Sequence, residues 1–198
     1  NGMRPMMKLA EPLLLLKETH GEKVRIRISL DHYQERFHKL ERGNRSWEAT
    51  LIGLKWLTEH KFNVNVAGRT CWEEQEDSLR QGYRKLFFDE GIEIDAYDNS
   101  KLILFPEMDE TVDVPEISAH CWDILNVNPK DIMCATSRMV VKRKGANHTT
   151  VLPCTLLPYD RRFEMGNTLV GALGKVVLNH PHCAKFCVLG GGTCSIPT

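Results

Sequence analysis

The chain has 198 residues, of which 42% are hydrophobic and 26% are charged, and its 26 basic residues balance its 26 acidic residues. This length suggests one domain, or one domain with a small appendix, and it allows a core to form without stabilising cross-links. The balanced charge argues against binding to nucleic acid or to an anionic membrane surface, because both favour a basic excess, and no apolar run approaches the length of a membrane span.

Strand patterns recur three times in the N-terminal half of the sequence. Apolar and polar residues alternate in residues 23–31 and again in residues 62–68, and this period of two is typical of a β-strand with one buried face. Residues 100–107 contain a third, shorter apolar run, which Pro106 ends. The sequence therefore predicts three strands in this half of the chain.

Helical periodicity separates these strands. The predicted helices lie within residues 5–18, 41–61 and 73–91. Pro12 is expected to kink the first helix or to delay its start, Ser46 is the expected N-cap of the second, and Gly91 ends the third. Alternating helices and strands favour a parallel α/β sheet or barrel, in which the active site lies at the C-terminal ends of the strands.

The alternation stops near residue 107. An acidic linker and a short helix are followed by a β-hairpin, predicted over residues 137–154 around Gly145. The remaining residues form an irregular, cysteine-rich region. We therefore expect two domains, residues 1–107 and residues 108–198.

Polar residues follow the first two predicted strands. Ser29 and Asp31 lie at the end of the first strand, and Arg69 follows Gly68 at the end of the second. Arg69 is well placed to contact an anionic substrate, although a surface arginine fits the pattern equally well. Four further residues have the helical spacing of metal ligands: Asp31, His32, Glu35 and His38. A run of this kind is more often the solvated face of a helix.

The sequence contains seven cysteines, and an odd number without a recognisable export signal argues against a disulfide framework and favours a cytoplasmic protein. Four of them, separated by 28, 3 and 6 residues, form a candidate metal site: Cys154, Cys183, Cys187 and Cys194. Four thiolates suit an iron–sulfur cluster or a structural zinc ion with His180 or His182 as substitute ligands, and loosely packed thiols are the third interpretation. The other three are expected to be core or near-surface thiols: Cys71, Cys121 and Cys134.

Several of these segments, in their order along the chain, resemble the radical S-adenosylmethionine superfamily. The opening NGMRP resembles the end of the third barrel strand. The stretch ISLDHYQERFHKLERG resembles the motif after the fourth strand, through Ser29, Leu30, Asp31, His38, Arg42 and Gly43. His32 departs from that motif, because glycine is usual there. FNVNVAGRT and LILFPE are similar to the fifth and sixth strands, and the C-terminal region looks like the auxiliary-cluster extensions called SPASM or Twitch, with a hairpin, the stretch MGNTLVGAL and clustered cysteines.

This resemblance implies an α/β fold in which residues 1–107 form the second half of a partial (β/α)6 TIM-like barrel. Residues 108–198 would form a small hairpin-containing, cysteine-rich domain that holds an auxiliary iron–sulfur cluster. A catalytic [4Fe–4S] cluster is also implied, but its C-x3-C-x2-C motif does not occur in this sequence. Because the chain begins with Asn1 rather than methionine, we expect that the N-terminal part of the enzyme, with that motif, is missing and that the chain is inactive alone.

The implied cofactor is S-adenosylmethionine, whose 5′-deoxyadenosyl radical would abstract hydrogen from an unknown small-molecule or peptide substrate, with a reductant supplying the electron. Asn1 and Gly2 are expected to line the floor near the methionine, and Ser29 to bond its ribose or methionyl end. Arg42, with Asp31 at the same strand end, is expected to pair with the cofactor carboxylate. The alternative is a non-catalytic interaction module with a four-cysteine zinc site.

Overall fold

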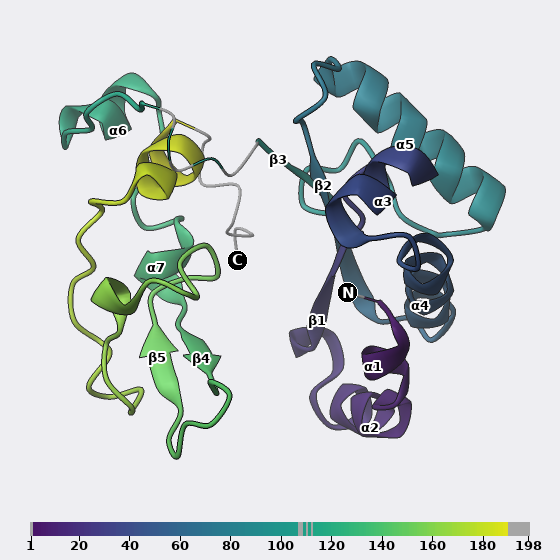
Figure 1. Ribbon diagram of the computed structural model, residues 1–198, viewed down its shortest axis with the longest axis horizontal. Coiled ribbons are helices and arrows are strands. Elements are labelled where there is room, and N and C mark those ends of the chain that lie inside the picture. Colours follow the sequence, from purple (N-terminus) through teal and green to yellow (C-terminus); the bar gives the residue numbers. More distant parts are fainter. Residues whose placement is uncertain (1, 107–108, 110, 112, 190–198) are drawn as a thin grey trace. The chain divides into compact units, whose positions relative to one another are not determined.

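The computed structural model describes residues 2–106, 109, 111 and 113–189. The chain forms two compact units, unit 1 (Asn1–Glu107) and unit 2 (Met108–Thr198) (Figure 1). Within the described ranges, none of the helices has the length and apolar character needed to cross a membrane.

Unit 1 is built on a three-stranded sheet. The strands are β1 (Arg25–Ser29), β2 (Asn63–Arg69) and β3 (Leu102–Phe105), in the order β1-β2-β3. Both pairs are parallel, and the register places Ile28 beside Val66 and Val66 beside Leu102. The parallel pairing predicted from the alternation of strands and helices is therefore present.

The helices of unit 1 differ from the predicted ones in their boundaries. They are α1 (Arg4–Met7), α2 (Ala10–His20), α3 (Glu35–Arg42), α4 (Trp47–Glu59) and α5 (Glu76–Glu90). The single helix predicted over residues 5–18 is interrupted before α2, and Pro12 lies in the first turn of α2, where its missing N–H costs no hydrogen bond.

The helix expected after Ser46 is α4, which begins at Trp47, and the residues before Ser46 form the end of α3 and a turn. The chain leaves α3 at Gly43, whose φ of +86° lies in a region that side chains disfavour, and α4 begins four residues later. Ser46 occupies the position before α4, as predicted, but its hydroxyl donates to the carbonyl oxygen of Gly43 at 2.7 Å instead of capping α4.

One face of the sheet packs against helices. Alternate residues of β1 and β2, such as Ile28 and Val66, are buried in one cluster with Leu54 of α4 and Tyr83 of α5. The described helices of unit 1 lie on that side of the strands (Figure 1). Because side chains alternate along a strand, the intervening residues point to the opposite face, which we call the open face. The name means only that no described helix of unit 1 packs on it. It carries Arg25, Arg27, Ser29, Asn63, Asn65, Ala67 and Arg69 on β1 and β2 and Ile103 and Phe105 on β3, and Asn65 and Ile103 are buried.

Unit 2 contains the predicted hairpin. Its strands β4 (Met139–Val141) and β5 (Thr150–Leu152) pair antiparallel. The short helices α6 (His120–Ile124) and α7 (Met133–Thr136) precede it, and a 3-10 helix (Arg161–Phe163) and a π-helical segment (Cys183–Val188) follow. The buried residues Cys154, Leu157 and Cys183 form a small apolar cluster.

Candidate functional site

The first candidate site lies where β1 ends. The amide of Leu30 donates to the carbonyl of Ala67 at 3.0 Å, and the amide of Arg69 donates to the carbonyl of Asp31 at 2.9 Å. These bonds continue the pairing of β1 with β2 beyond Ser29. They hold Asp31 at the C-terminal edge of the sheet, where parallel α/β proteins place their chemistry.

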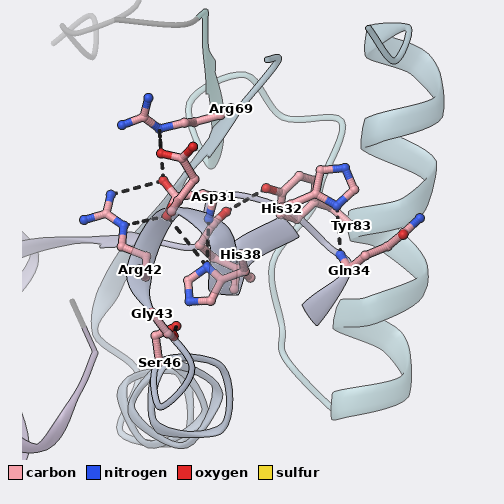
Figure 2. A network of polar contacts seen from close by, with 11 residues as sticks. Asp31, His32, Gln34, His38, Arg42, Gly43, Ser46, Arg69 and Tyr83 are labelled. Carbon is pink, nitrogen blue, oxygen red and sulfur yellow. Dashed lines mark hydrogen bonds and ion pairs between the residues drawn. The ribbon is translucent and has the colours of Figure 1, made fainter. Parts of the chain in front are cut away.

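The carboxylate of Asp31 binds two arginines (Figure 2). Arg42, the last residue of α3, donates from Nε at 2.5 Å and from Nη2 at 3.1 Å, and Arg69 donates from Nε at 3.3 Å. The Asp31 side chain is only 2% exposed. Its hydrogen bond to Arg42 is the largest cause of a raised pKa for that guanidinium. One buried carboxylate therefore fixes two guanidinium groups at the strand ends.

His38 of α3 completes this network (Figure 2). The amide of Asp31 donates to His38 Nδ1 at 3.2 Å, so the ring proton lies on Nε2. His38 is fully buried, and this burial lowers its pKa despite the nearby Asp31 carboxylate. Nε2 has no hydrogen-bond partner among the described residues, and the ring lies edge-on to Trp47. His38 is therefore a neutral residue that supports the Asp31 backbone.

His32 belongs to a separate group of contacts. Its Nδ1 accepts from the amide of Gln34 at 3.0 Å, so Nε2 carries the proton and donates to Glu74 at 3.1 Å. The Tyr33 hydroxyl donates to the other oxygen of Glu74 at 2.8 Å, and the rings of Tyr33 and Trp72 lie against the imidazole. Burial is the main cause of the lowered pKa of His32.

The structure does not bring the expected metal-ligand run together. Asp31 binds arginines, His32 binds Glu74, and Glu35 pairs with Lys39 one turn away on α3. The interpretation as a solvated helix face is also wrong for the two histidines, because His32 and His38 are both fully buried. Their side chains instead hold the loop between β1 and α3.

We expect the stability of unit 1 to fall when the pH is lowered below about 6.5. The pKa values of His32 and His38 are lowered from the ordinary 6.5, so the unfolded chain binds protons that the folded chain excludes. Each histidine contributes full stability above pH 6.5 and loses up to about 1.4 kcal/mol per pH unit as the pH falls from there toward its folded pKa.

Urea denaturation at pH 7.5, 6.5 and 5.5, followed by tryptophan fluorescence, measures this slope. A Trp122→Phe background removes the tryptophan of unit 2. The variant His38→Asn should reduce the slope, and the exposed His20→Asn should leave it unchanged. An equal slope in all three proteins would contradict the assignment to His38.

The other residues expected to contact the cofactor lie apart from the Asp31 network. Ser29 is half-buried on the open face, beside Ala67, and its hydroxyl makes no hydrogen bond within the described residues. Gly2 is buried against α4, so closely that a Cβ added to Gly53 would lie 1.7 Å from the Gly2 carbonyl oxygen. Asn1 lies outside the described residues.

The second candidate site is a group of cysteines in unit 2. Four of them line one cavity of about 10 Å³, together with apolar side chains: Cys134, Cys154, Cys183 and Cys187. Three of these are residues of the predicted metal site. The fourth predicted ligand, Cys194, lies outside the described residues. The described part of the chain contains no group of three or more His, Cys, Asp or Glu side chains arranged to hold a metal ion.

Cys134 was expected to be a core or near-surface thiol, and it is half-buried, but it also lies near Cys154 and Cys183, which its spacing in the sequence did not indicate. The pKa of Cys134 is raised to about 11, mainly by burial and in addition by the neighbouring thiols of Cys154 and Cys183. The hairpin explains the meeting: Met139 pairs with Leu152, so residues that flank the two strands return to the same place. The predicted hairpin could therefore have indicated that Cys134, which precedes it, and Cys154, which follows it, lie near each other.

Burial also raises the pKa of Cys154 and of Cys183, so these thiols are protonated at neutral pH. His180 and His182 are both buried and lie close to Cys183 in the sequence, but neither is among the residues that line the cysteine cavity. The amide of His182 donates to His180 Nδ1 at 3.1 Å, and His180 Nε2 lies 4.0 Å from Asp160. The structure thus groups thiols with thiols, in a site whose donors are chemically soft.

Comparisons with protein-family models, with curated proteins and with solved structures gave no match. The functional assignment therefore rests on the two sites described above.

Proposed function

We propose that this chain is part of a cytoplasmic radical S-adenosylmethionine enzyme, in which unit 1 contributes to a (β/α)6 barrel and unit 2 carries an auxiliary metal site. The observation that carries this proposal is the open face of the sheet. All-parallel sheets normally have both faces covered. Here the helices of unit 1 pack on one face, and the other carries polar residues along β1 and β2, such as Arg27, Ser29 and Arg69, beside Ile103 and Phe105 of β3. A ligand-filled barrel interior accounts for a polar face of this kind.

Arg42 and Ser29 would contact S-adenosylmethionine at this edge. Asp31 uses Nε and Nη2 of Arg42, so Nη1 remains to bind the cofactor carboxylate, and Asp31 acts as a positioning residue for Arg42. Ser29 lies on the open face of β1, and its hydroxyl makes no hydrogen bond among the described residues. In this superfamily the cofactor supplies hydrogen-atom abstraction from a substrate. We assign no residue of this chain to the catalytic [4Fe–4S] cluster, because the sequence has no C-x3-C-x2-C motif.

The auxiliary site would use the four cavity thiols, Cys134, Cys154, Cys183 and Cys187. Soft thiolates suit iron–sulfur clusters and zinc, so the donor chemistry fits both. The four described thiols are not arranged to hold a metal ion as they stand, so binding would have to draw them together. The cavity of about 10 Å³ is no larger than the space for one water, so a cubane cluster would have to widen it. A single zinc ion needs less room, which favours the second candidate function, a non-catalytic zinc-binding interaction module.

Metal analysis of the anaerobically purified chain distinguishes these functions. We expect iron and acid-labile sulfide, with visible absorbance, and we expect Cys134→Ala and Cys154→Ala each to lose most of the metal, because each removes one thiolate of four. Cys121→Ala is the matched control, since Cys121 contacts Ser118 and does not line the cavity.

Zinc without visible absorbance would identify the interaction module instead. A chain that binds neither metal after reconstitution, or a Cys134→Ala variant that keeps its full metal content, would overturn the four-thiol site.

A further inference from the structure

Arg69 is held in place but is not fully used. Its amide donates to the Asp31 carbonyl, and its Nε lies 3.3 Å from Asp31 Oδ1 and 3.6 Å from Glu41 Oε2. Its two terminal amino groups contact no acceptor in the part of the chain that the structure describes. Figure 2 shows these terminal nitrogens pointing away from Asp31. Several N–H donors of one anchored guanidinium are therefore left for a ligand.

The guanidinium groups of Arg42 and Arg69 share the carboxylates of Asp31 and Glu41. The carboxylate of Asp31 serves both Arg42 and Arg69, so it neutralises only one of the two guanidinium groups. Glu41 is the other acid within 4 Å of Arg69, and its side chain is about one-third exposed. Along β1 and β2, the open-face positions hold three arginines and no acidic residue. Because Asp31 and Glu41 together balance the charges of Arg42 and Arg69, recognition of an anion depends on the N–H donors of Arg69 that these carboxylates leave unused.

We propose that Arg69 binds an oxyanion of the substrate, a carboxylate or a phosphate. A guanidinium presents its donors in a planar fork that matches such a group, and the buried Asp31 holds that fork in one orientation before the ligand arrives. Arg69 ends β2 and shares the open face with Ser29, so a ligand on Arg69 lies beside the edge assigned to the cofactor. That the oxyanion belongs to the substrate rests on the proposed function, whereas its binding to Arg69 does not.

The test is a titration of the metal-free chain with inorganic phosphate and, separately, with succinate, at constant ionic strength. The readout is the Nε–H resonance of each arginine in nitrogen-15 nuclear magnetic resonance. We expect a saturable shift of the Arg69 resonance with a dissociation constant on the order of 1 mM. The anion that saturates at the lower concentration identifies a phosphate or a carboxylate ligand.

Variants separate specific binding from general attraction. Arg69→Gln should weaken binding at least tenfold, Arg69→Lys should weaken it less, and Arg84→Gln on the exposed side of α5 should leave it unchanged. The wild-type Arg69 resonance gives an answer even if Arg69→Gln fails to fold. No saturable shift of that resonance, or equal weakening by Arg84→Gln, would overturn the inference. Neither result depends on metal content, so the proposed function is tested separately.

Discussion

Replacing Asp31 with asparagine is expected to lower the free energy of unfolding of unit 1 by about 2–3 kcal/mol. Asparagine has nearly the same shape, so the change removes the negative charge without opening a cavity. Arg42 and Arg69 would then face each other across a neutral side chain. Breaking a fully buried ion pair costs about 3–5 kcal/mol, and we expect less because the two arginines are 31% and 23% exposed and regain water.

Urea denaturation of the Trp122→Phe background at pH 7.5 measures this loss. Asp89→Asn is the matched control, because Asp89 pairs with Lys85 on the exposed surface of α5, and we expect it to cost less than about 0.5 kcal/mol. The double variant Asp31→Asn, Arg69→Gln should recover part of the loss, since it removes one uncompensated charge. If Asp31→Asn were as stable as the control, the network would not stabilise the fold.

Replacing Gly68 with alanine is expected to destabilise unit 1 by about 2–4 kcal/mol. A Cβ at this position would lie 2.4 Å from the Tyr83 hydroxyl oxygen and 2.9 Å from Cδ2 of Leu104. Tyr83 is fully buried and cannot move outward, and its hydroxyl donates to the carbonyl of Leu30 at 2.6 Å. The alanine would therefore force the tyrosine aside and also remove this hydrogen bond.

Thermal and urea unfolding of Gly68→Ala measure the effect. Gly174→Ala should be close to neutral, because no atom lies within 4 Å of a Cβ at Gly174. Adding Tyr83→Phe to Gly68→Ala should restore part of the stability by removing the atom that lies closest to the new methyl group. A double variant no more stable than Gly68→Ala would show that the contact with Tyr83 is not the cause.

The main elements of unit 1 could be predicted because they depend on local patterns. The period of two in residues 23–31 and 62–68 is set by burial of one sheet face, and the parallel pairing follows from the helices between the strands. The start of α4 at Trp47 agrees with the expected N-cap Ser46, whereas the turn at Gly43 that ends α3 was not predicted. Whether a glycine there adopts a positive φ depends on how the chain must turn, which the pattern does not record.

The contacts of the candidate sites could be predicted only in part. Asp31 and Arg69 were found because strand ends are informative, but their mutual hydrogen bond needs the register of β1 with β2. The burial of His32 depends on Glu74 and Trp72, which lie about forty residues away in sequence. Cys134 was missed because metal-ligand spacing is a local rule, whereas a hairpin brings this cysteine to the site.

At the proposed auxiliary site, the raised pKa values of Cys134, Cys154 and Cys183 would make metal loading a proton-exchange reaction. A thiol must lose its proton to become a ligand, and Cys134, with a pKa of about 11, holds its proton most firmly. For each proton released, the apparent dissociation constant of the metal falls tenfold per unit rise in pH, until the pH reaches the raised pKa values. Mild acid would therefore empty a loaded site without a chelator, and the same cavity that protects the thiols as neutral groups would set the pH at which they take up a metal.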